Sequence, residues 1–260
     1  AALTGNSVAT LNLTGSSDTI FTATTGSSKL ATISAGSFSG DLTLPAAVAA
    51  LNQTITTGTG NDTVAMGARL TAADTIDLGG NSLIAGTATT GSDTLTATGN
   101  IGSVLAASAL NISNVEAYEQ SIGAQAATYI DASKLSGVSS LAFSNDTNGG
   151  TVKLTNVASG QKIGLGIGAS AANVVELGKT STVTLDVALA DATGTEDSIT
   201  LDYADGTLEA NSVTLKTAGI ETLNIAAPKK GSAVTSTLVN TNNEVSTINI
   251  TSGNIAGTGT

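Results

Sequence analysis

The chain has 260 residues, of which 40% are hydrophobic but only 2% aromatic and 11% charged, and its formal net charge is −11. Nine basic residues are too few for a face that neutralises phosphates, so nucleic acid is excluded as an expected partner, and no apolar run is long enough for membrane insertion. The chain contains no cysteine and no histidine, which excludes Ser-His-Asp and Cys-His catalysis and favours calcium over zinc as a bound metal.

Apolar and polar side chains alternate along much of the chain, a pattern typical of half-buried β-strands. In chain order the first such segment runs from Ala9 to Leu13, and a long one runs from Val183 to Leu189. Alanine-rich stretches at Pro45–Leu51 and Val104–Leu110 favour short helical pieces instead. Further strands are predicted around Ile20, Ile33, Leu42, Ile55, Val64, Ile76, Leu95, Leu141, Leu154, Val175, Ile199, Val213, Leu223 and Ile248.

The spacing of these segments, often about ten residues, fits either a β-sandwich or a solenoid of short strands joined by turns. Thr, Ser and Asn stack well from rung to rung, and a core of small aliphatic side chains suits a flat coil. We therefore predict an all-β fold, a parallel β-solenoid or β-roll with irregular or sandwich-like parts.

An internal repeat of roughly a hundred residues is visible in three pairs of short segments. Asp93-Thr94-Leu95 is echoed by Asp197-Ser198-Ile199, an offset of 104 residues, which is 197 minus 93. Val115-Glu116 is echoed by Ile220-Glu221, and Val138-Ser139 by Val245-Ser246. The pattern predicts two β modules, 1–120 and 121–260, which meet near residues 117–130 and arose by partial duplication.

The segment Gly58-Thr59-Gly60-Asn61-Asp62-Thr63-Val64 matches most of a glycine- and aspartate-rich calcium-binding turn. In such a turn glycines expose carbonyl oxygens, an aspartate supplies a carboxylate, and an apolar residue two positions later is buried. The next turn is degraded, because Arg69 places a cation where ligands would be needed.

These motifs make Asp62 and Asp93 the leading candidate calcium ligands. Backbone oxygens at Gly58 and Gly60 would complete the shell. The remaining candidates are Asp74, Asp77, Gly91 and Asp197. The alternative is that each is an ordinary Gly/Asp turn beside a strand, and for Asp197 that alternative is the stronger one.

Together with Asn111–Glu116 and Ala218–Ala227, these motifs resemble the RTX-type surface-layer (S-layer) proteins of Gram-negative bacteria, especially the Caulobacter kind. The resemblance implies secretion, calcium-driven folding outside the cell, and self-assembly with lattice neighbours on the bacterial surface. Contact with cell-surface polysaccharide would run through regions outside these 260 residues.

The expected function is therefore that of a non-enzymatic structural protein, a segment of a calcium-dependent two-dimensional lattice. The alternative is a calcium-stiffened segment of a large RTX adhesin. A third interpretation, a polysaccharide-cleaving enzyme using carboxylate pairs such as Asp74 and Asp77, is disfavoured because sugar clefts usually need aromatic platforms.

Overall fold

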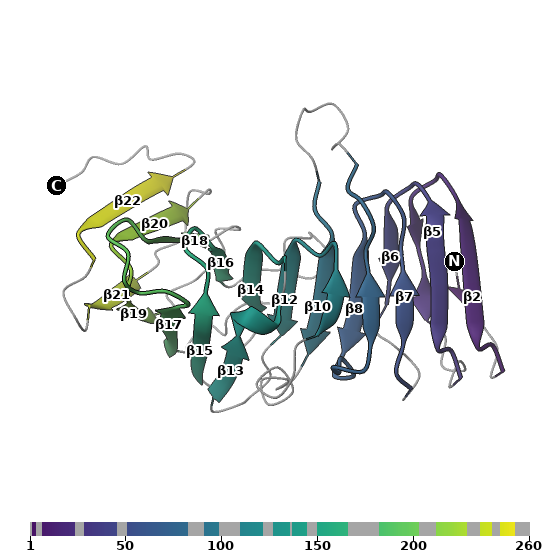
Figure 1. Ribbon diagram of the computed structural model, residues 1–260, viewed down its shortest axis with the longest axis horizontal. Coiled ribbons are helices and arrows are strands. Elements are labelled where there is room, and N and C mark those ends of the chain that lie inside the picture. The colour runs from purple at the N-terminus through teal and green to yellow at the C-terminus, as the bar shows by residue number, and fades with distance from the viewer. Residues whose placement is uncertain are drawn as a thin grey trace. The chain divides into compact units, whose positions relative to one another are not determined.

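The computed structural model describes residues 2–3, 7–23, 29–45, 51–82, 91–98, 110–121, 127–135, 137–144, 150–165, 182–202, 212–227, 235–240 and 245–252. These residues form parallel strands and turns, which confirms the predicted parallel β-solenoid (Figure 1). They divide into two compact units, each described by itself: residues 1–119 with 134–138, and residues 120–133 with 139–260. The chain passes from the first unit to the second within β12 (Ala117–Ser121).

Unit 1 is built from two parallel sheets whose strands alternate along the chain. One sheet, here called the front sheet, has the order β11-β9-β7-β5-β2. Its strands are β2 (Thr10–Gly15), β5 (Thr32–Phe38), β7 (Thr54–Thr56), β9 (Thr75–Asp77) and β11 (Asn111–Ser113). The other, here called the back sheet, runs from β10 to β3, with strands β3 (Thr19–Ile20), β6 (Leu42–Leu44), β8 (Thr63–Gly67) and β10 (Thr94–Thr98). The short strands β1 (Ala2–Leu3) and β4 (Thr22–Ala23) pair with each other.

Each rung of unit 1 contributes one strand to each sheet, and equivalent residues align from rung to rung. Thr32 pairs with Thr54 and Thr54 pairs with Thr75 in the front sheet. The first step is 22 residues (54 minus 32) and the second is 21 (75 minus 54). Two strands per rung account for the spacing of about ten residues between the predicted strands.

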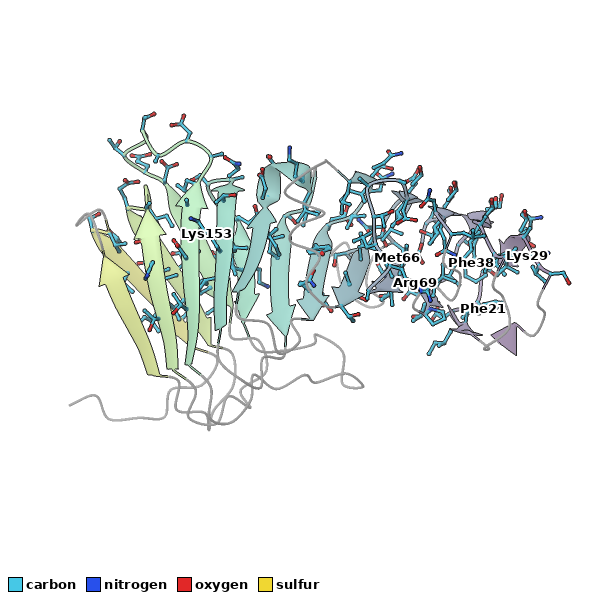
Figure 2. All side chains as sticks on the ribbon, turned by 90° about the horizontal axis from the view of Figure 1, so that it is seen from below. Phe21, Lys29, Phe38, Met66, Arg69 and Lys153 are labelled. Atoms are coloured by element: carbon cyan, nitrogen blue, oxygen red, sulfur yellow. The ribbon has the colours of Figure 1, made fainter. Side chains whose placement is uncertain are left out.

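The core of unit 1 consists of aliphatic columns on the inner faces of the two sheets. Ile33, Ile55 and Ile76 are buried and in register on the front sheet. Leu44, Val64 and Leu95 form the corresponding buried column of the back sheet. Phe38 and Met66, both labelled in Figure 2, are larger buried side chains between them, with exposed fractions of 6% and 1%. Burial of such columns is the main stabilising contribution to the unit.

Unit 2 repeats the parallel arrangement with longer strands. One sheet contains β14 (Ser140–Ser144), β16 (Lys162–Leu165), β18 (Ser198–Asp202), β20 (Thr222–Ala227) and β22 (Thr247–Ser252). The other contains β13 (Ala127–Asp131), β15 (Gly150–Val157), β17 (Thr182–Leu189), β19 (Ser212–Ala218) and β21 (Thr235–Asn240). Its core includes the buried residues Leu154, Val187, Ile163, Leu201 and Leu223.

The strands expected from alternation coincide with observed strands wherever the structure describes the residues. The strand expected at Val175 lies outside the described residues, as do most of the two helical stretches expected at Pro45–Leu51 and Val104–Leu110. A single 3₁₀ turn, η1 (Ala132–Lys134), is the helical element among the described residues. No helix within these residues is both long and apolar enough to cross a membrane.

Gly58 and Gly60 allow successive rungs of unit 1 to approach closely. A Cβ atom on Gly58 would overlap the carbonyl oxygen of Phe38, and one on Gly60 would overlap the carbonyl oxygen of Gly40. Both obstacles are backbone atoms of the preceding rung, so they cannot move aside without disturbing the ladder. The glycines of the calcium-turn motif therefore have a packing role that needs no metal.

We predict that Gly60→Ala lowers the free energy of unfolding by about 1–3 kcal/mol, because the added methyl group overpacks against backbone. Gly80→Ala is the matched control, since a Cβ there meets nothing within 4 Å and the residue is exposed. Urea denaturation followed by circular dichroism measures both variants. Equal stability of the two variants would contradict this packing role.

Candidate functional site

Five acidic residues form a column along the back sheet of unit 1, called the carboxylate column below. Each one directly precedes a strand: β3, β6, β8, β10 or β12. Because these strands are neighbours in the sheet, the five side chains lie one above another in successive rungs. The members are Asp18, Asp41, Asp62, Asp93 and Glu116.

Hydrogen bonds join this column from rung to rung. The Asp62 backbone N–H donates to Asp93 Oδ1 over 2.6 Å, and the Asp93 N–H donates to Glu116 Oε2 over 2.9 Å. The Leu42 N–H donates to Asp62 Oδ1 over 2.8 Å. Asp18 and Asp41 instead accept from the rung that follows them, from the N–H groups of Asp41 (3.0 Å) and Asn61 (2.7 Å). The carboxylates thus satisfy backbone donors where the strands begin.

Asp62 and Asp93 lie at the centre of the column with exposed fractions of 0%. The second oxygen of each, Oδ2, is buried and has no hydrogen-bond partner among the described residues. The Oδ1 atom of Asn61, the residue before Asp62, is likewise buried without a hydrogen-bond partner among the described residues. The centre of the column therefore contains buried oxygen acceptors that need a proton, a cation or an ordered water.

Burial raises the pKa of both aspartates. Desolvation, together with the negative charges of Asp62, Glu116 and Asp41, raises the pKa of Asp93 to about 7, although the Asp62 N–H opposes this by stabilising the charged form. Desolvation, and to a smaller extent the charge of Asp41, also raises the pKa of Asp62, against the opposing effects of the nearby Thr57 hydroxyl and of the Leu42 and Gly58 N–H groups. At neutral pH the Asp93 carboxyl group is accordingly close to half-protonated.

A second arrangement of the same kind lies in unit 2. The Asp197 N–H donates to Glu221 Oε2 over 2.9 Å, as the Asp93 N–H does to Glu116 in unit 1. The residue two positions before each glutamate has a positive φ, 54° at Asn114 and 73° at Gly219. The segments paired by the sequence repeat therefore share one local structure.

Asp197 differs from Asp62 and Asp93 in its exposure, because its residue is only half-buried. Its Oδ2 atom is nevertheless buried, packs over Gly194, and has no hydrogen-bond partner in the described parts of the chain. Asp197 is thus a third acceptor of the type found at the centre of the carboxylate column.

Asp74 and Asp77 belong to the front sheet and not to the carboxylate column. Asp74 is buried and uses both oxygens, accepting from the Gln53 N–H (2.7 Å) on one and from Thr71 N–H (2.7 Å) on the other. Asp77 is half-buried on the outer face of β9, where its Oδ1 accepts from Gly79 N–H and Asn114 Nδ2. The structure therefore places Asp62 and Asp93 in one column, whereas Asp74 and Asp77 lie on the front sheet outside that column.

The predicted glycine ligands take part in packing between rungs. The Gly58 carbonyl oxygen accepts the Gly80 N–H over 2.8 Å, and Gly91 lies against the Asn61 side chain. Each carbonyl has a second lone pair, so Gly58 keeps the capacity for another contact. Arg69, labelled in Figure 2, is exposed beyond the end of β8.

The oxygen atoms at the centre of the column are of the type that binds a hard cation such as calcium. The buried Oδ2 atoms of Asp62 and Asp93 are oxygen acceptors, the ligand type that calcium prefers. No cluster of three or more acidic side chains with metal-binding geometry occurs among the described residues. Two carboxylates would therefore need an amide oxygen, carbonyl oxygens or water to complete a coordination shell.

Four acidic residues of these columns were not among the predicted calcium ligands: Asp18, Asp41, Glu116 and Glu221. A sequence signal is present for three of the five column members and for both acidic residues of unit 2, namely an acidic residue followed by Thr or Ser and then by an apolar residue; Asp41 and Glu116 lack it. It occurs as Asp18-Thr19-Ile20, Asp62-Thr63-Val64, Asp93-Thr94-Leu95, Asp197-Ser198-Ile199 and Glu221-Thr222-Leu223.

Comparison with known proteins gives no relative from which a function could be transferred. No protein-family model, curated protein or solved structure matches the chain.

We predict that, with divalent ions removed, unit 1 becomes less stable as the pH rises from about 4 to about 7. The folded pKa of Asp93 lies above its ordinary value of 3.8, so the folded state binds more protons in this interval and loses that advantage as the pH increases. The full effect is on the order of 4 kcal/mol, because each pKa unit corresponds to about 1.4 kcal/mol. Urea denaturation at a series of pH values measures it.

Asp93→Asn should flatten this pH dependence, since the amide oxygen still accepts the Asp62 N–H but the group no longer titrates. Asp18→Asn, at the exposed end of the same column, is the matched control and should keep the slope. An unchanged slope in Asp93→Asn would contradict the assignment to Asp93.

Proposed function

We propose that this chain is a non-enzymatic structural segment of a calcium-dependent, self-assembling layer on a bacterial cell surface. The observation that carries the proposal is the pair of buried Oδ2 atoms on Asp62 and Asp93, which lack a hydrogen-bond partner within the described residues. An ionised carboxylate buried in this way is costly unless it is paired with a cation.

Calcium is the cation that the residues suit best. The Oδ2 atoms of Asp62 and Asp93 would hold it, with Asn61 Oδ1 as a third oxygen ligand, and it would neutralise two stacked negative charges. Asp197 offers a similar buried oxygen in unit 2. An affinity roughly in the millimolar range is expected for an extracellular structural site.

Assembly into a layer is supported by the way the units are built. Each rung buries its inner face against neighbouring rungs and leaves regular outer faces of short polar side chains, as in extended repeat proteins. With a net charge of −11, copies of the chain repel one another, and divalent cations would reduce that repulsion. Catalysis by Asp74 is disfavoured, because both of its oxygens accept hydrogen bonds inside the protein.

We expect millimolar calcium to raise the thermal unfolding midpoint of the chelator-treated protein and magnesium to raise it less, because magnesium demands a stricter octahedral shell. The double variant Asp62→Asn, Asp93→Asn should lose most of the calcium response. Asp186→Asn is the control for loss of charge alone, since Asp186 lies on the outer face of β17 in unit 2, and it should keep the response. Circular dichroism during heating measures all three proteins.

Electron microscopy of the calcium-loaded protein tests assembly separately. Ordered sheets that disappear on chelation are the expected result. Dispersed particles that attach to surfaces only in calcium would favour the adhesin alternative. A protein whose unfolding midpoint and association are both unchanged by chelation would overturn the proposal.

A further inference from the structure

Strand β22 forms the edge of its sheet in unit 2 (Figure 1). Its six residues are in unbroken parallel register with β20, from the pair Thr222 and Thr247 to the pair Ala227 and Ser252. Within the described residues, the other edge of β22 pairs with no strand. The backbone N–H and C=O groups on that edge can therefore receive a further strand.

Two aliphatic columns of the core run out to this edge. Ile248 continues the column of Ile199 and Leu223, whose exposed fractions are 0% and 2%, but Ile248 itself is 50% exposed. Ile250 continues the column of Ile225 in the same way and is 66% exposed. The side chains that would form the core of a further rung are therefore already in place on β22.

Unit 1 has an edge of the opposite kind at β2 and β3, the first strands of its front and back sheets. Leu11 on β2 continues the buried column of Ile33 and Ile55 but is only half-buried itself. Ile20 on β3 is 65% exposed. Three of the four large exposed hydrophobic side chains among the described residues thus lie on the two edge strands β3 and β22.

The edge strands lack the residues that usually prevent pairing with other chains. Natural sheets protect their edges with charged side chains, especially lysine, and with proline. None of the four edge strands β2, β3, β21 and β22 contains a charged residue or a proline. Because the chain has a net charge of −11, uncharged edges are where two copies approach with the least repulsion.

The two kinds of edge are complementary to each other. Every strand pair in the two units is parallel, so a strand that continues the ladder at β22 must run in the same direction and keep its apolar side chains on the inner face. Two copies of β22 can pair only antiparallel or with their inner faces reversed. Strand β3 offers the opposite edge of the back sheet, and β2 offers the corresponding edge of the front sheet. The partner that fits the β22 edge is therefore the β3 edge of a second copy.

We propose that copies of this chain associate end to end, with β3 and β2 of one copy added in parallel to β22 and β21 of another. Main-chain hydrogen bonds between the edges and burial of Leu11, Ile248 and Ile250 stabilise the contact. The contact joins two different surfaces and does not close on itself, so it repeats into a filament. Its role as a row of the layer rests on the proposed function, whereas the contact itself does not.

Sedimentation velocity of the full chain in calcium, over a range of protein concentrations, tests the contact. The unmodified chain should form a concentration-dependent series of dimers, trimers and larger oligomers. Leu11→Lys introduces a charge at one edge and Ile250→Lys at the other, and each variant alone should remain monomeric, because its one intact edge finds no complement. An equal mixture of the two should form dimers and nothing larger, since only the two intact edges can pair.

Thr10→Lys and Thr251→Lys are the matched controls. Both side chains are exposed and alternate with Leu11 and Ile250 along their strands, so they lie on the outer face and not on the core side of the edge. Both variants should associate as the unmodified chain does. Circular dichroism establishes that each variant is folded before it is compared.

Three results would overturn the proposal: an unmodified chain that stays monomeric, a Leu11→Lys variant that dimerises alone through β22, or an equal loss of association in the two controls. If calcium raises the unfolding midpoint but the mixture stays monomeric, the end-to-end contact alone is wrong. If the mixture forms dimers while chelation leaves the stability unchanged, the contact is supported and the calcium dependence of the proposed function is wrong.

Discussion

The hydrogen bond from a backbone N–H of one rung to a carboxylate of the neighbouring rung organises this protein. It places an acidic residue directly before successive strands of the back sheet, as at Asp62, Asp93 and Glu116. Parallel pairing leaves donors at the ends of each strand, and a carboxylate is a strong acceptor for them. Because neighbouring strands are about 4.8 Å apart, the carboxylates that accept these hydrogen bonds are stacked along the sheet at about the same spacing.

The same residues are therefore subject to two opposing demands. Accepting an N–H favours the ionised form of Asp93, whereas burial and the charges of Asp62 and Glu116 favour the protonated form and bring its pKa to about 7. A proton or a bound cation removes the conflict, and each has a different consequence. Protonation would make the stability of the fold depend on pH, and a bound cation would make it depend on the concentration of that ion.

Much of the fold could be predicted from local pattern, because alternation around Ile55, Val64 or Leu95 depends only on which side of a strand is buried. The buried position of Asp62 could not be predicted in this way, because its motif fits an exposed turn as well as the buried start of a strand. The carboxylate column has no constant spacing in the sequence, because the rungs differ in length. Asp41, Asp62 and Asp93 are separated by 21 and 31 residues (62 minus 41, 93 minus 62). Only the strand register shows that they are neighbours. Calcium binding itself remains a prediction.

Register also connects the inside of the unit with its outside. A slip of one residue in the front sheet would move Ile55 out of the core and would move Thr54 and Thr56 into it, so the aliphatic columns define the polar ones. The alignment of the outer polar columns of the front sheet is therefore a by-product of core packing. What packing does not fix is the chemistry of these outer positions, since the front sheet carries mainly Thr, Ser and Asn there, whereas β15, β17 and β19 align Lys153, Asp186 and Lys216.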